Sequence, residues 1–142
     1  MKFSTALILT TALALFGCSK SSTSDETQVR ELIVTAENAA EARDVGDVLE
    51  LVGADYADAQ GNTRDSLAPF LRAFFAIHPK LELMTSVDSL EFPVDGLARA
   101  RVTVRGLQLD RLSLGETVTL DVELRRDGGA WRVVRADRVN AG

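Results

Sequence analysis

Cysteine and histidine are nearly absent from this sequence, which contains one of each among its 142 residues. This scarcity excludes a disulfide framework and any zinc site built from cysteine and histidine within one chain. A glycine-rich phosphate loop, a G-x-S-x-G nucleophile motif and an H-E-x-x-H metal motif are also missing. An excess of positive charge is lacking too, because the net charge of −5 argues against nucleic acid as the default partner. We therefore expect no cofactor, no metal site and no nucleic-acid partner.

The N-terminal segment has the pattern of an export signal. A positive charge at Lys2 is followed by an apolar run over Ala6 to Phe16, which is too short to span a bilayer but fits the apolar region of a signal peptide. The next residues, Leu15-Phe16-Gly17-Cys18, resemble the lipobox of bacterial lipoproteins, in which the cysteine is lipidated. The alternative is an ordinary signal peptide with a coincidental cysteine, but no A-x-A-like cleavage site follows.

This resemblance implies a division of the chain into three parts. Residues 1–17 are the predicted signal peptide, 18–27 are a lipidated cysteine with a flexible polar tether, and 28–139 are the folded domain. The acyl chains, palmitate among them, would anchor the domain to a membrane. Because Ser19 rather than aspartate follows Cys18, the family pattern favours the outer membrane, facing the periplasm, in a Gram-negative cell.

Apolar residues make up 46% of the chain, enough for one globular domain with its own core. Helical spacing of apolar residues predicts a first helix over Asp25–Arg43, a short second helix, and a third over Ser66–Ile77 with Asp65 as its N-cap. In the first helix, Glu37 and Glu41 are expected on the solvated face.

The second half of the domain alternates apolar and polar residues with the period of two that is typical of strands. Strands are expected over 81–87, 98–105, 117–125 and 130–136, with residues 90–92 either continuing the first strand or re-entering the sheet. Turns are expected at 93–96 and at Asp127-Gly128-Gly129. Helices followed by strands predict an α+β domain in which the helices cover one face of an antiparallel sheet of about four strands.

This order of elements resembles the NTF2-like superfamily, also called SnoaL-like or cystatin-like. The residues that carry the resemblance are Asp55-Tyr56-Ala57-Asp58 between the second and third helices, and the closing hairpin over Asp127–Val133, which contains Trp131. The resemblance implies a curved antiparallel sheet packed on three N-terminal helices, with a cone-shaped pocket between them. The family includes isomerases, dehydratases and many non-catalytic domains, so the fold implies a cavity and not a reaction.

Four residues are candidates for catalysis within such a pocket: Tyr56, Asp55, Asp58 and His78. A phenol beside a carboxylate in an apolar cone could polarise a carbonyl and move a proton, and a histidine at the pocket mouth could act as acid or base. The structural alternative places Tyr56 at the cone edge, uses the aspartates in a loop, and puts His78 at the C-terminal end of the third helix. We favour the structural alternative for each.

Two further groups of residues are candidates for binding. Phe70, Phe74 and Trp131 are expected to line the pocket, with Trp131 also anchoring the final hairpin. Arg99, Arg101 and Arg105 share one strand face, which fits an acidic protein partner, a lipid headgroup or a second copy of the chain. Cross-strand pairing with Asp121 and Glu123 is the structural alternative.

The expected function is that of an envelope lipoprotein whose domain binds an apolar small molecule or a protein partner without catalysis. The alternative is a small isomerase- or dehydratase-like enzyme that uses a tyrosine–aspartate pair.

Overall fold

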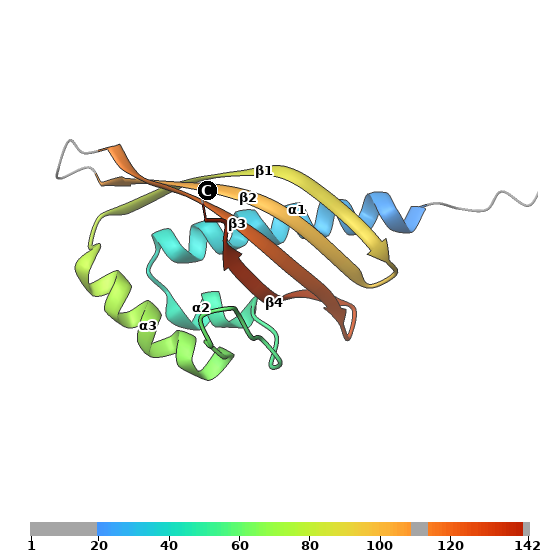
Figure 1. Cartoon of the computed structure of the whole chain (residues 1–142), viewed down its shortest axis with the longest axis horizontal. Coiled ribbons are helices and arrows are strands. Elements are labelled where there is room, and N and C mark those ends of the chain that lie inside the picture. Colours follow the sequence, from blue (N-terminus) through green and yellow to red (C-terminus); the bar gives the residue numbers. More distant parts are fainter. Residues whose placement is uncertain (1–19, 109–113, 141–142) are drawn as a thin grey trace, which may run out of the picture.

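The computed structural model describes residues 20–108 and 114–140, so Cys18 and the predicted signal peptide lie outside the described residues. Three helices precede four strands (Figure 1). They are α1 (Lys20–Glu41), α2 (Val45–Glu50), α3 (Arg64–Ile77), β1 (Leu81–Val94), β2 (Leu97–Gln108), β3 (Leu114–Asp127) and β4 (Ala130–Arg138). No helix among the described residues combines the length and apolar character needed to cross a membrane.

The strands form one antiparallel sheet in the order β1-β2-β3-β4. The sheet curves over the helices, which all lie on its concave side (Figure 1). Two-residue turns join β1 to β2 and β3 to β4, and glycines with positive φ stand at Gly96, Gly128 and Gly129, where side chains would be strained. The α+β architecture expected from the sequence, with three helices on a curved four-stranded sheet, is confirmed.

The core lies between α1 and the concave face of the sheet. Its centre joins apolar side chains of α1 to those that alternate along β2 and β3, with Trp131 of β4 closing one end. The largest fully buried members are Val29 and Leu124. The period-two pattern of β2 therefore has a direct cause, because alternate residues such as Ala98 and Val102 face α1 while the arginines between them face solvent.

Two expected boundaries are wrong. α1 begins at Lys20 rather than Asp25, so most of the segment expected as a flexible tether continues the helix instead. α3 begins at Arg64, and its N-cap is Thr63 rather than Asp65. Thr63 and Ser66 exchange hydrogen bonds between side chain and backbone in a capping box, which satisfies two N–H groups at once.

Candidate functional site

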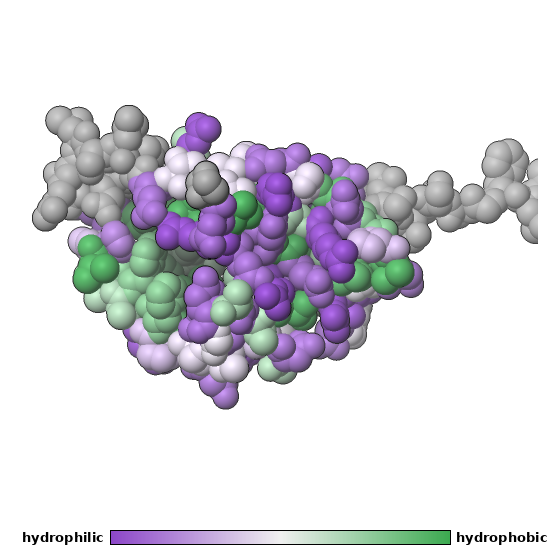
Figure 2. All heavy atoms as spheres, viewed as in Figure 1, coloured by the Kyte–Doolittle hydropathy of each residue, from purple (hydrophilic) through white to green (hydrophobic). Residues whose placement is uncertain are grey.

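A cavity of about 650 Å³ lies between the sheet and the helices. The C-terminal half of α1 forms one wall, α2 and α3 form another, and the concave faces of the strands form the roof. Most of its lining is apolar, with Ala36, Leu71, Phe74 and Val104 among the contributors. Figure 2 shows the molecule hollowed between the sheet and the apolar side chains of α3.

The position of α3 leaves this space unfilled. α3 packs mainly against α2 rather than against the sheet. Arg64, at the first turn of α3, donates hydrogen bonds to the backbone oxygens of Leu49 and Val52. Leu49 lies in the last turn of α2 and Val52 lies two residues beyond its last residue, so Arg64 binds the backbone at and just after the C-terminal end of this helix. Arg64 thus holds α3 at the side of the molecule while its apolar face borders the cavity.

Tyr56 is placed by a segment that runs beside β4. The N–H of Gly53 donates to the oxygen of Val133 at 2.9 Å, and the N–H of Ala57 donates to that of Val134 at 3.1 Å. Gly53 permits this close approach, since a Cβ there would lie 3.2 Å from Val134 Cγ1 and 3.0 Å from Asp55 Oδ1. The segment covers part of the edge of β4 and turns the ring of Tyr56 inward, where only 5% of the residue is exposed.

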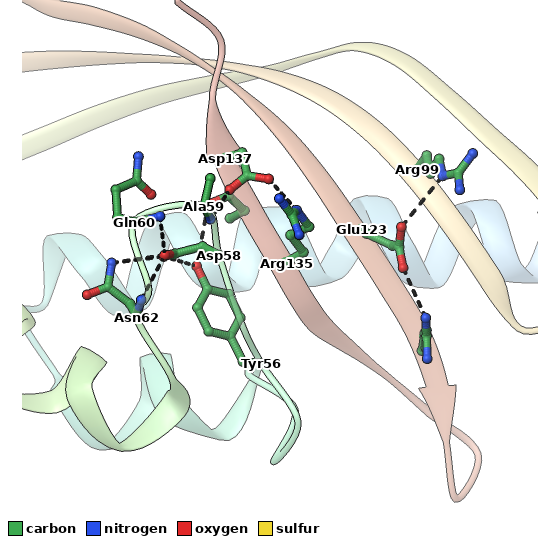
Figure 3. A network of polar contacts seen from close by, with 11 residues as sticks. Tyr56, Asp58, Ala59, Gln60, Asn62, Arg99, Glu123, Arg135 and Asp137 are labelled. Carbon is green, nitrogen blue, oxygen red and sulfur yellow. Dashed lines mark hydrogen bonds and ion pairs between the residues drawn. The ribbon is translucent and has the colours of Figure 1, made fainter.

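The phenol of Tyr56 donates a 2.9 Å hydrogen bond to Oδ2 of Asp58 (Figure 3). Asp58 also accepts from the backbone N–H groups of Gln60 and Asn62 and from the amide nitrogen of Asn62. Both carboxylate oxygens are therefore occupied by donors from the same loop. Tyr56 and Asp58 both line the cavity, as the catalytic alternative requires. Their hydrogen bonds are directed at each other, at the loop and, from the phenol at 3.5 Å, at the backbone oxygen of Ala136 on β4.

The surroundings shift the pKa values of Tyr56 and Asp58 in opposite directions. Burial, the hydrogen bond to Asp58 and the charges of Asp58 and Asp137 raise the pKa of Tyr56 well above its ordinary value. Burial acts to raise the pKa of Asp58 as well, but the hydrogen bonds from Asn62, Tyr56 and Gln60 together lower it below the ordinary aspartate value. At neutral pH the pair is a neutral phenol bound to a carboxylate, and neither group is poised to exchange a proton near pH 7.

The other two catalytic candidates do not line the cavity. Asp55 is exposed in the loop before Tyr56. His78 is the C-cap of α3, and its ring lies 4.4 Å from that of Phe74, centroid to centroid. The structure therefore does not bring Asp55 or His78 together with Tyr56 and Asp58 at one site.

Two of the three predicted pocket aromatics border the cavity. Phe70 and Phe74 lie along α3 with ring centroids 6.3 Å apart, and both contribute to the lining. Trp131 does not line the cavity, which corrects the expectation. It is 3% exposed in the core, packs edge-on against Phe92, and carries the guanidinium of Arg126 5.0 Å from its ring centroid. Arg126 in turn pairs with Asp25 of α1.

The predicted partner surface lies on the convex face of the sheet, outside the cavity. Arg101 makes two hydrogen bonds to Asp121, which lower the pKa of Asp121, and Arg99 lies 3.6 Å from Glu123. Figure 3 shows the Arg99–Glu123 pair on its strands. Arg105 is exposed on the same strand. The cross-strand pairs proposed as the structural alternative are thus present for Arg99 and Arg101.

Two carboxylates on α1, those of Glu37 and Glu41, bind the edge of the sheet, which the sequence analysis did not predict. Glu41 accepts the backbone N–H of Leu83, and Glu37 accepts both the backbone N–H and the hydroxyl of Thr85. These N–H groups belong to β1, an edge strand of the sheet. The expectation that Glu37 and Glu41 lie on a solvated face is wrong, because they hold α1 against this edge. The spacing of four residues between Glu37 and Glu41 is visible in the sequence. The strand edge to which they bind could not be predicted from it.

Metal ligation finds no support among the side chains that the structure describes. Within 20–108 and 114–140, no group of three or more histidine, cysteine, aspartate or glutamate side chains is arranged to hold a metal ion.

Solved structures with the same architecture are numerous. One is a protein of unknown function with a cystatin-like fold from Nostoc punctiforme, with a TM-score of 0.70 and 14% identity over 80% of this chain and 89% of that one. Another is an NTF2-like protein of unknown function from Pseudomonas putida, with a TM-score of 0.67 and 20% identity over 82% and 86% of the two chains.

The fold is NTF2-like. A third solved structure with a similar architecture is a protein from Novosphingobium aromaticivorans assigned provisionally as a scytalone dehydratase, with a TM-score of 0.69 and 12% identity over 85% of this chain and 87% of that one. No protein-family model matches the sequence, and no curated protein matches it. At these identities the likeness extends to the fold alone.

Proposed function

We propose that the NTF2-like domain binds an apolar small molecule in its cavity and does not transform it. The observation that carries this proposal is the open, mainly apolar space of about 650 Å³ under the sheet. Cavities of several hundred cubic ångströms with a few polar groups are typical small-molecule sites. Burying the apolar surface of a ligand there would supply the main free energy of binding.

The alternative is an isomerase- or dehydratase-like enzyme, and the presence of Tyr56 and Asp58 in the cavity wall favours it. The hydrogen bonds count against it. A carbonyl substrate would need the phenol proton that Asp58 already accepts, and Asp58 could act as a base only by losing donors from its own loop. Their geometry supports a role in fixing the loop that closes this side of the cavity.

We further propose that the chain is a lipoprotein anchored to a cell-envelope membrane through Cys18. The support is the sequence Leu15-Phe16-Gly17-Cys18 after a short apolar run. Replacing Cys18 with serine should release the protein from the membrane fraction, measured by fractionation and immunoblotting. Retention of the Cys18→Ser variant in that fraction would contradict the anchor and leave the cavity proposal untouched.

Ligand binding can be tested on the fragment Ser19–Gly142, which contains every residue that forms the helices and the sheet. The probe is N-phenyl-1-naphthylamine, an uncharged apolar dye whose fluorescence rises in apolar surroundings. We expect saturable binding that weakens at least tenfold in Ala36→Trp, because the indole would fill the cavity next to α1.

The matched control is Ala73→Trp, which adds the same side chain to an exposed position on α3 and should leave binding unchanged. Ala40→Phe is a second cavity-filling variant in case Ala36→Trp does not fold, which circular dichroism will show. Equal dye binding by the wild type and both filling variants would contradict the proposal. For the enzyme alternative, Tyr56→Phe should abolish turnover of any substrate that is found.

A further inference from the structure

Three charged side chains border the cavity among the described residues: Glu37, Asp58 and Arg138. Two of them are compensated within the protein. Asp58 is occupied by the donors of its own loop, and Arg138 pairs with Glu116 at the rim. A ligand gains little by meeting these two groups, because it would have to displace partners that are already in place.

Glu37 differs from both. The backbone N–H and the hydroxyl of Thr85 both bind the same carboxylate oxygen, Oε2. Within 20–108 and 114–140, no hydrogen bond or ion pair reaches the other oxygen, Oε1. Glu37 is half-buried and borders a mainly apolar space, so it keeps one acceptor oxygen without a protein partner where water is partly excluded.

The one cation in the described lining does not neutralise Glu37. Thr85 lies on β1 and Arg138 on β4, at opposite edges of the sheet. Three strand spacings separate these edges, which is about 14 Å along the sheet. Across that distance an exposed arginine that already has a carboxylate partner contributes little at physiological salt.

We propose that the ligand of this cavity is a cationic amphiphile, in which an apolar body fills the space and a protonated amine binds Oε1 of Glu37. The inference rests on the proposed binding function and adds the charge of the ligand to it. Oε1 of Glu37 is accessible to solvent, so an ammonium group would take the place of water there, and a charge-assisted hydrogen bond of this kind is stronger than a neutral one. The net charge of −5 also favours a cationic ligand, because a negatively charged protein attracts cations.

The test compares three ligands with the same ten-carbon chain: decylamine, decan-1-ol and decanoate. Isothermal titration of the fragment Ser19–Gly142 at pH 7 should show that decylamine binds roughly tenfold or more tightly than decan-1-ol, with decanoate weakest. In Glu37→Gln the preference for the amine should disappear while decan-1-ol still binds. Glutamine keeps an oxygen for Thr85, so the contact between α1 and β1 is retained.

Glu41→Gln is the matched control. Glu41 lies one turn farther along α1 and binds an N–H of the same strand edge, but it does not border the cavity. This variant should keep the full preference for decylamine. If decan-1-ol binds and the amine binds no better, or if Glu37→Gln keeps the preference, the inference is wrong and the proposed function stands. If none of the three binds, the inference is wrong, and the titration with N-phenyl-1-naphthylamine decides the proposed function separately.

Discussion

The loop that contains Asp58 depends on one carboxylate for most of its internal hydrogen bonds. Asp58 accepts from Tyr56, Gln60 and Asn62. A carboxylate with this many donors is held ionised, and its protonation in the folded state must weaken several bonds at once. At the residue scale, these hydrogen bonds fit the structural role that the sequence analysis favoured for the pair, because they support the cavity wall.

Removing the phenol oxygen tests this explanation. Tyr56→Phe deletes one hydrogen bond to a charged acceptor and leaves the buried ring in place. The free energy of unfolding should fall by about 1–2 kcal/mol, measured by urea denaturation, while N-phenyl-1-naphthylamine still binds within a few-fold of the wild type. Unchanged stability would show that this hydrogen bond does not support the loop.

The lowered pKa of Asp58 predicts a dependence of stability on pH. Because the pKa is lower in the folded state than in the unfolded state, the unfolded chain binds more protons between the two values. The stabilisation is therefore complete above the unfolded value, near pH 4, and is lost as the pH falls through the folded value. Urea denaturation between about pH 3 and pH 6 should show that the free energy of unfolding of the wild type falls as the pH is lowered.

Two variants isolate the contribution of Asp58. Asp58→Asn should be less stable at pH 6 and should lose less stability on acidification. Asp55→Asn, which removes the same charge from an exposed position in the same loop, should retain the acid dependence of the wild type. An equally steep acid limb in Asp58→Asn would assign the dependence to other carboxylates, of which Asp121 is one with a lowered pKa.

At the element scale, the periodic segments were predictable and the contacts between them were not. Alternation along β2 and β3 has one cause, burial of one face, and it specified both strands in advance. The boundary of α3 was less determined, since Thr63 and Asp65 are both good N-caps by residue type. The role of Glu37 required knowing which strand edge lies beside α1, and this depends on tertiary packing that no local pattern contains.

The capping box of α3 makes its own prediction. Thr63→Ala removes the side chain that accepts the N–H of Ser66, and should lower the free energy of unfolding by about 1 kcal/mol. Asp65→Ala should have a smaller effect, because Asp65 lies inside the first turn and contributes mainly through the helix dipole. Chemical denaturation measures the free energy of unfolding of both variants. A larger decrease in Asp65→Ala than in Thr63→Ala would mean that Asp65 is the N-cap, as expected from the sequence.

At the scale of the whole molecule, α1 separates the proposed anchor from the proposed site. Only Ser19 stands between Cys18 and the first residue of α1. The helix has 22 residues and is therefore about 33 Å long. Its C-terminal half borders the cavity, and α3 lies at the opposite end of the molecule from the start of α1 (Figure 1). A domain anchored at Cys18 can thus hold its cavity away from the lipid surface, so that ligands enter from water.

A label on α3 tests this orientation. In the full-length protein inserted through the proposed anchor, where lipidation would block the sulfur of Cys18, the variant Ala73→Cys offers a free thiol at an exposed site on α3. A nitroxide attached there reports its surroundings. In vesicles, a water-soluble relaxation agent should affect the label as strongly as it does in the fragment Ser19–Gly142, and oxygen dissolved in the lipid should add no further relaxation. The same label at Ser24, exposed near the start of α1, should respond to the lipid more strongly, because it lies beside the anchor. A response to lipid at position 73 that equals or exceeds the response at position 24 would mean that α3 rests on the membrane, and the apolar cavity would then draw its ligand from the bilayer rather than from water.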